Sequence, residues 1–157
     1  MKLVSHSAEE TKRLGAALAA CLQPGDVVVL NGDLGAGKTQ FVQGVAEALG
    51  VTGEVTSPTF NILLTYDCAS GVLNHFDLYR LESAEDLDDI GYWEVLEGGG
   101  VSFIEWGDKF PSEMPDDYLE VAITSGTDGV RSIKAQPHST RAQELCACWG
   151  QVAEERA

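Results

Sequence analysis

The chain has 157 residues, of which 44% are hydrophobic, and its 25 acidic residues against 10 basic ones give a formal net charge of −15. A chain of this length and apolar content can bury one hydrophobic core, so the composition predicts one globular domain. The negative charge repels nucleic-acid backbones and anionic lipids, and no cluster of lysines and arginines offsets it. The composition therefore disfavours direct, tight binding of nucleic acid, and a separate protein would have to hold any nucleic-acid substrate.

Targeting signals and cysteines point to a soluble protein without a redox or zinc site. We find no signal peptide and no apolar run long enough to span a membrane, so we expect a cytoplasmic protein. The four cysteines show neither zinc-type nor C-x-x-C spacing. Cys21 falls on the apolar stripe of a predicted helix, where a free thiol acts as a small hydrophobe. We interpret Cys146 and Cys148 as neither a redox nor a metal pair.

The first predicted elements are a helix, a strand and a second helix. Ser7 and Glu10 have the spacing of a capping box, and apolar residues then recur at helical spacing until Pro24. The run VVVL at 27–30 predicts a short buried strand. A glycine-rich loop follows it, and the next helix, apolar on one face, is predicted to end at Gly50.

The loop between this strand and helix reads NGDLGAGKTQ. Its glycines, lysine and threonine match the phosphate-loop pattern G-x-x-x-x-G-K-[ST] in full. Glycines let backbone N–H groups approach phosphate oxygens, and the following helix aims the positive end of its dipole at the same place. Lys38 can reach the outer phosphates, and the Thr39 hydroxyl can ligate Mg²⁺. The strand–loop–helix context favours phosphate binding over a flexible turn. The residues expected to contact the nucleotide are Asp33, Leu34, Gly35, Ala36, Gly37, Lys38, Thr39 and Gln40.

A magnesium ion in such a loop needs an acidic side chain at the end of a neighbouring strand. Glu105, after the apolar run VSFI, and Asp77, in HFDLYR, are the two candidates. For either acid alone, a solvated strand-end carboxylate is an equally good interpretation. His75 shares a strand face with Asp77, and we assign it no catalytic role. Trp106, next to Glu105, could stack on a base or fill the core, and we interpret it as a core or partner contact. Because Mg²⁺ cancels part of the triphosphate charge, the acidity of the chain itself predicts metal-dependent binding.

The stretch TSPTF precedes a predicted strand. It must be extended before Pro58, because proline disfavours the helical region for the residue preceding it. Thr56, Ser57 and Thr59 fit two interpretations, a simple turn and a switch that closes on the outermost phosphate. Spacing does not separate them.

The remaining elements are two hairpins, two helices and a strand. The runs FNILLTY and VLNHFDLY, separated by DCASG, predict an antiparallel hairpin, and an acidic helix then runs from Ser83 to about Leu96. The run VSFIEW predicts a buried strand, and YLEVAIT and VRSIKAQ predict a second hairpin around Asp128 and Gly129. A last helix over about 140–149 completes a single domain at 1–150, and residues 151–157 are expected to fray.

Size and motif content narrow the class of phosphate-loop protein. Large oligomeric ATPases need a second, helical domain, and the N-K-x-D motif of guanine-specific proteins is missing. A small-molecule kinase usually closes an arginine-rich lid, whereas this chain has five arginines without a cluster, and only Arg80 adjoins a proposed site motif. These features favour an ATPase or ATP switch with slow intrinsic hydrolysis that a partner accelerates. A small-molecule kinase and a non-hydrolysing nucleotide switch remain as alternatives.

Four motifs, GDLGAGKT, TSPTF, HFDLYR and IEW, follow one another in this short chain. Together they resemble the bacterial TsaE (YjeE) family of ATPases, over about residues 7–123. The resemblance implies an α/β fold of the P-loop NTPase type, with a mainly parallel central sheet flanked by antiparallel strands, hairpins and helices. It also implies a role in making threonylcarbamoyladenosine at adenosine 37 of tRNAs that read codons beginning with A.

The resemblance also implies roles for individual residues. ATP would lie on the loop with Lys38, and Mg²⁺ would be held by Thr39 and Glu105. Asp77 would support the metal or a water molecule, which completes the catalytic set of Lys38, Asp77 and Glu105. The stretch TSPTF would act as the switch. The first helix would lie near the base, which makes Thr11 a candidate for contacting adenine.

Members of that family act with two partner proteins, TsaB and TsaD. TsaD transfers the threonylcarbamoyl group to tRNA, and the ATPase drives turnover or resetting of the complex without making that bond. The resemblance therefore implies that tRNA meets this chain only through the partners, which agrees with the charge argument. No membrane contact is expected, and the sequence leaves the oligomeric state open.

Overall fold

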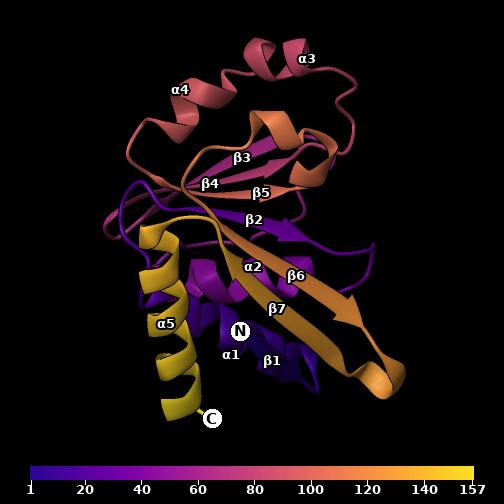
Figure 1. Ribbon diagram of the computed structural model, residues 1–157, viewed down its shortest axis with the longest axis vertical. Coiled ribbons are helices and arrows are strands. Elements are labelled where there is room, and N and C mark those ends of the chain that lie inside the picture. Colours follow the sequence, from indigo (N-terminus) through magenta and orange to yellow (C-terminus); the bar gives the residue numbers. More distant parts are fainter.

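One seven-stranded sheet with helices on both faces forms the protein in the computed structural model, which describes residues 1–157 (Figure 1). The strands are β1 (Lys2–Ser5), β2 (Val27–Asn31), β3 (Leu63–Cys68), β4 (Gly71–Asp77), β5 (Val101–Glu105), β6 (Leu119–Ser125) and β7 (Arg131–Pro137). Their order across the sheet is β1-β7-β6-β2-β5-β4-β3. The central strands β6, β2, β5 and β4 are parallel, whereas β1, β7 and β3 pair antiparallel with their neighbours. The predicted α/β architecture and both predicted hairpins are confirmed.

The helices and short turns connect these strands. The α-helices are α1 (Ala8–Ala19), α2 (Lys38–Ala48), α3 (Ala84–Asp89), α4 (Tyr92–Leu96) and α5 (Thr140–Glu155). Three 3₁₀ turns are η1 (Gly107–Lys109), η2 (Pro111–Glu113) and η3 (Thr127–Gly129). None of the helices combines the length and the apolar character that crossing a membrane requires.

Side chains that alternate along the strands divide the core into two layers. Val28 and Leu30 of β2 join the cluster formed with α1, α2 and α5, whereas Val27 and Val29 join the cluster with α3 and α4. This is the alternation expected for a central strand covered on both faces. The layer with α1, α2 and α5 matters for function, because α2 directly follows the glycine-rich loop.

Helices α1 and α2 cross at two glycines. A Cβ atom on Gly15 would lie 2.2 Å from the carbonyl oxygen of Phe41, and one on Gly44 would lie 2.0 Å from that of Lys12. Real Cβ atoms do not approach backbone oxygens so closely, so no other residue fits at either position without moving a helix. The two helices therefore contact each other backbone to backbone.

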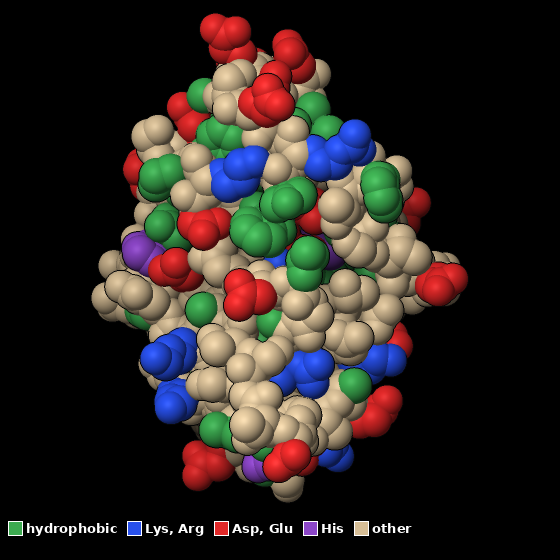
Figure 2. All heavy atoms as spheres, turned by 90° about the vertical axis from the view of Figure 1, so that its right-hand side faces the viewer, with side chains coloured by type: hydrophobic (Ala, Val, Ile, Leu, Met, Phe, Trp, Pro, Cys, Tyr) green, Lys and Arg blue, Asp and Glu red, His purple; other side chains and the backbone are tan.

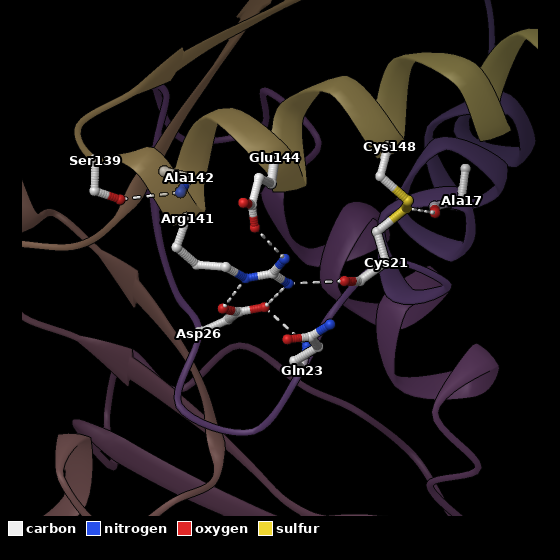
Figure 3. Close-up of polar contacts among 9 residues, drawn as sticks. All are labelled: Ala17, Cys21, Gln23, Asp26, Ser139, Arg141, Ala142, Glu144 and Cys148. Atoms are coloured by element: carbon white, nitrogen blue, oxygen red, sulfur yellow. Dashed lines mark hydrogen bonds and ion pairs between the residues drawn. A yellow bond between two sulfur atoms is a disulfide. The ribbon is translucent and has the colours of Figure 1, made fainter.

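Three contacts, which we call the clasp, hold helix α5 to the rest of the molecule: Cys148 with Cys21, Arg141 with Asp26, and Trp149 with Leu14. Cys148 forms a disulfide with Cys21, just after the end of α1, and the Arg141 guanidinium makes two hydrogen bonds to the Asp26 carboxylate (Figure 3). Trp149 is fully buried and donates its indole N–H to the carbonyl of Leu14, 2.9 Å away. These contacts join the C-terminal helix to the segment that leads into β2.

Three sequence-based predictions about this framework were wrong, and one strand was missed. Cys21 is not a free thiol, because α1 and α5 lie side by side and bring its sulfur atom to that of Cys148, 127 residues away in the chain. The helix predicted from Ser83 to Leu96 is two helices, since Gly91 adopts a left-handed conformation with φ of 68°. Helix α5 ends at Glu155 rather than near 149, so most of the segment expected to fray is helical. Strand β1 was not predicted.

Candidate functional site

A polar cavity of about 170 Å³ lies at the edge of the sheet where the parallel strands β2, β4 and β5 end. Its lining residues are Leu34, Gly35, Gly37, Lys38, Thr39, Gln40, Ser57, Thr59, Asp77, Glu105, Trp106 and Arg131. Ligands of open α/β sheets bind outside the carboxyl ends of the strands, so the cavity has the expected position. The cavity unites the loop, the TSPTF segment and both candidate acids, which lie up to 71 positions apart in the chain (34 to 105).

The loop that forms one wall leads directly into α2. Gly37 precedes the helix with φ of 110°, and no side chain caps the first turn. The first backbone N–H groups of the helix therefore remain available to an anion, and the helix dipole adds to their attraction. In the structure the Lys38 ammonium donates a hydrogen bond to the carbonyl of Gly32 at 2.6 Å. The lysine thus holds the start of the loop close to the start of α2, and together they form a place where an anion could bind.

A buried charge cluster lies behind the loop. The Lys38 ammonium is 3.5 Å from one carboxylate oxygen of Glu105, and the Nε2 atom of His75 is 2.5 Å from the other. Glu105 is 3% exposed and His75 is 0% exposed. Parallel pairing of β4 and β5 places Asp77 opposite Glu105, and alternation turns His75, Asp77 and Glu105 toward the face covered by α2. The strand register therefore brings both acids to the lysine.

The TSPTF segment lines the cavity with Ser57 and Thr59, and one of their hydroxyls contacts Asp77. Thr59 donates a hydrogen bond to Asp77 at 2.8 Å, and its Oγ1 lies 2.9 Å from the Ser57 hydroxyl. The other Asp77 oxygen accepts the backbone N–H of Tyr79 at 2.9 Å. Thr56 is exposed and does not line the cavity. Of the three proposed switch residues, two are therefore at the site.

Arg131, the first residue of β7, is a site residue that the sequence did not reveal. Its guanidinium donates to the loop carbonyls of Ala36 at 2.5 Å and Gly35 at 3.4 Å. The view that only Arg80 adjoins the site is therefore wrong. A signal existed in the topology: β7 pairs antiparallel with β6, which is parallel to β2, so β7 must begin at the edge where β2 ends.

Two bulky residues beside the cavity have an unusual backbone. Trp106 has φ of 61° and Ile62 has φ of 67°, values that side chains with a Cβ atom rarely adopt. Such strain persists only where the surroundings impose it, and it is concentrated at functional sites. The left-handed turn at Trp106 places its indole ring 4.6 Å from the Lys38 ammonium. Trp106 is therefore part of the site, not only of the core.

The other residues predicted to contact nucleotide lie outside the cavity lining. Ala36 is buried and Asp33 is exposed, although both belong to the loop. Thr11 is fully buried in α1, and its hydroxyl hydrogen-bonds with Ser5 and with the carbonyl of Ser7. The structure does not bring Thr11 to the loop, and its contact with adenine stays a prediction.

The face that carries the cavity is turned to the viewer in Figure 2, where hydrophobic side chains gather near the centre and basic ones lie above them. Few large hydrophobic side chains are exposed in the molecule. Three of them are Leu34, which lines the cavity, and Phe60 and Tyr79, which lie close in the sequence to lining residues. The guanidinium of Arg80 lies 5.8 Å from the Phe60 ring, and the ammonium of Lys109 lies 5.6 Å from the Tyr79 ring. Exposed hydrophobic side chains and two basic ones therefore lie close together in the segments that border the cavity.

The fold and the site together define a P-loop protein. A model of the family described as "Threonylcarbamoyl adenosine biosynthesis protein TsaE" matches residues 5–133. The chain therefore belongs to the TsaE family, and the resemblance drawn from its four motifs is confirmed.

Individual relatives agree with this assignment. The chain is 46% identical over 133 residues to the tRNA threonylcarbamoyladenosine biosynthesis protein TsaE of Treponema pallidum, covering 85% of this chain and 98% of that one. It is 41% identical over 138 residues to the protein of that name from Bacillus subtilis, covering 88% and 86%. Its structure matches the crystal structure of Bacillus subtilis YdiB with a TM-score of 0.80 and 33% identity, covering 100% of this chain and 96% of that one. The family model ends before α5, so the residues that α5 contributes to its contacts with the segment before β2 lie outside the matched range.

Proposed function

We propose that the chain binds ATP with Mg²⁺, hydrolyses it slowly by itself, and serves the threonylcarbamoyladenosine modification of adenosine 37 in tRNAs reading codons that begin with A. The observation that carries this proposal is the buried Lys38–Glu105 pair, 3.5 Å apart, at the polar cavity. Family membership supports the pathway, and the pair supports the chemistry. The location proposed for this activity is the cytoplasm.

Lys38 would exchange partners when a nucleotide enters. Its ammonium now contacts a neutral carbonyl and one carboxylate oxygen. Phosphate oxygens offer a stronger, charge-assisted interaction, so the ammonium would turn to the outer phosphates. The Glu105 oxygen that faces Lys38 would then be free to act on a water molecule or a metal ion. The same motion therefore binds substrate and frees the acid.

The residues at the cavity fit a magnesium ion. Mg²⁺ prefers oxygen ligands and binds through one or two carboxylates together with substrate phosphates. Thr39 and Glu105 would hold it, and Asp77 lies opposite Glu105 in the adjoining strand. The ion would neutralise charge on the phosphates as a Lewis acid.

Asp77 and Thr59 would couple the nucleotide to the TSPTF segment. Their hydrogen bond holds the segment at the cavity. A hydroxyl that turns from Asp77 to the ion or the outermost phosphate would pull the segment inward and release the carboxylate to orient water. Asp77 would thus support the reaction, while Lys38 and Glu105 act directly.

The partners we propose are TsaD and TsaB, with tRNA bound by them rather than by this chain. The net charge of −15 opposes direct contact with tRNA. Arg131 and Arg80 are the arginines that contact the loop or TSPTF, and both interact with backbone carbonyls. Additional positive charge for the transferring phosphoryl would come from a partner, which accounts for slow hydrolysis by the chain alone.

The proposal is tested by steady-state ADP release from Mg·ATP, with the chain alone and with purified TsaD and TsaB. Slow release that rises severalfold with the pair is the expected result. Fast release that ignores the pair would contradict the assignment and revive a small-molecule kinase, which a screen for phosphate acceptors would detect. Binding of ATP without release of ADP under either condition would favour a non-hydrolysing switch.

A further inference from the structure

His75 makes a contact that the proposed chemistry does not use. Its Nε2 atom lies 2.5 Å from the Glu105 carboxylate, while its Nδ1 atom is buried and has no hydrogen-bond partner. A polar atom left without a partner in the interior costs about 1–3 kcal/mol, so proteins rarely retain one without a compensating role. The imidazole is thus committed to a single partner, and that partner is the acid at the nucleotide site.

The geometry selects one arrangement of the imidazole proton. With the proton on Nε2, the ring donates to a carboxylate oxygen, which can only accept. With the proton on Nδ1, a buried N–H would lack an acceptor and the Nε2 lone pair would face a carboxylate oxygen 2.5 Å away. Both consequences are unfavourable, so His75 is an Nε2–H donor to Glu105.

Glu105 depends on this donor because it has few other partners. Its other oxygen has only Lys38, at 3.5 Å, and that ammonium would leave when a nucleotide arrives. Without a second partner, the side chain would be free to rotate at the moment when its orientation matters. His75 is fully buried in β4, where its backbone pairs with neighbours on both sides, so its position is fixed.

We propose that His75 is a positioning residue for Glu105: it holds one carboxylate oxygen through Nε2–H, so that the other faces the cavity whether or not Lys38 is near. This inference rests on the proposed function, because it treats Glu105 as the acid that acts on metal or water. In metal sites, groups that orient a ligand in this way commonly change metal affinity or activity by about 10–100-fold when removed.

The test compares two substitutions at this position. His75→Leu removes the donor at similar volume, whereas His75→Gln keeps an N–H group near the position of Nε2. We expect His75→Leu to weaken the affinity for Mn²⁺, measured by electron paramagnetic resonance in the presence of ATP, by about 10–100-fold, with a similar loss of kcat. Binding of ATP without metal should change less than about threefold, because it depends on the loop and Lys38. His75→Gln should recover most of the metal affinity.

The chain supplies a matched control. His138 also contacts a glutamate, with Nε2 3.1 Å from Glu120, but this pair is more exposed and does not line the cavity. His138→Leu should leave metal affinity and kcat unchanged. A purely structural role for His75 would lower stability in both variants at that position without separating metal affinity from metal-free binding.

Each result is decisive. Wild-type metal affinity in folded His75→Leu, or equal losses in His75→Leu and His75→Gln, would overturn the inference while leaving the proposed function intact. Failure of the wild-type chain to bind Mn·ATP would overturn both. If His75→Leu does not fold, nitrogen-15 NMR of the wild-type imidazole decides: a proton on Nε2 supports the inference, and a neutral ring with its proton on Nδ1 alone overturns it.

Discussion

Two buried carboxylates lie at opposite ends of the same central strands and are held in different ways. Asp26, just before β2, is 8% exposed and accepts two hydrogen bonds from Arg141 and one from the Gln23 backbone (Figure 3). Glu105, at the end of β5, is 3% exposed and has one short contact, to His75, and one longer ion pair, to Lys38. The first acid is saturated, and the second keeps an oxygen that a ligand could use.

The difference separates a structural contact from a functional one. Arg141 presents a planar fork to Asp26, and its hydrogen bonds to that carboxylate raise the pKa of the guanidinium, so Arg141 keeps its charge. Lys38 is a flexible point charge that divides its contacts between Gly32 and Glu105. We infer that the clasp under α5 holds the chain together, whereas the cluster at the loop exchanges partners.

The largest expected effect comes from removing the cation at the loop. Lys38→Ala should lower kcat/KM for ATP by about 10²–10³-fold or more, because an interaction with the transferring phosphate is lost. ADP release measures it. Lys12→Ala is the control, since that lysine makes only a long surface pair with Glu47 at 4.0 Å. Equal activity of the two variants would show that the Lys38–Glu105 contact has no functional role.

The next effect concerns the clasp. Replacing both Cys21 and Cys148 by serine, or reducing the wild-type chain, should lower the free energy of unfolding by about 2–5 kcal/mol, because the disulfide closes a loop of more than a hundred residues. Affinity for ATP should not change. Urea unfolding followed by circular dichroism gives the first quantity, and Cys68→Ser, at a free cysteine, is the control. A loss of nucleotide affinity without a loss of stability would show that the disulfide serves nucleotide binding and not the stability of the fold.

Replacing Arg141, the partner of Asp26, should lower the free energy of unfolding by less than the loss of the disulfide does. Arg141→Ala leaves a buried carboxylate without its fork, and we expect destabilisation of about 1–3 kcal/mol. The measurement is again urea unfolding. Arg13→Ala removes a surface arginine whose pair with Glu10 is 3.8 Å long and should cost far less. Comparable costs in the two variants would show that the clasp is not a stabilising contact.

Arg131 contacts the phosphate loop, so its replacement should affect ATP binding rather than stability. Arg131→Ala removes donors to the loop carbonyls of Gly35 and Ala36, so we expect about a tenfold rise in the Kd for ATP with little change in stability. Isothermal titration measures the affinity. Arg131→Lys retains the charge but not the fork and should recover only part of it. Full recovery would mean that charge alone matters at this position.

The smallest effect is expected at an exposed carboxylate. Hydrogen bonds from the backbone N–H groups of Glu82 and Ser83 lower the pKa of Asp86 below its ordinary value of 3.8. A lowered folded pKa means that the ionised side chain stabilises the fold above that ordinary value, and that this contribution is lost as the pH falls through the folded pKa. Asp86→Asn should therefore make stability decline less steeply in acid. Urea midpoints from about pH 2 to 6 measure it, with Asp88→Asn as the charge-matched control.

Local patterns predicted much of this molecule because local physics determines them. The phosphate loop needs glycines, a lysine and a threonine at fixed spacing, and both hairpins have turn residues between strand-like runs. Three features depend instead on the sheet register or on which helices are neighbours: the His75–Glu105 contact, the position of Arg131, and the Cys21–Cys148 disulfide. Strand β1 was missed because KLVS is short and at the edge, where alternation is weak.

The glycine crossing of α1 and α2 bears on how the cavity could close. Because backbone touches backbone there, the two helices have no side-chain layer through which to slide, and the disulfide ties α5 to the same block. The loop that begins α2 therefore belongs to a stiff wall. Opposite it, residues 51–60 include only two buried positions, Val55 and Pro58, and such segments open at low free-energy cost. One wall of the cavity is therefore rigid and the other can move. Closure would consist of a movement of TSPTF toward the loop, while the loop keeps its position.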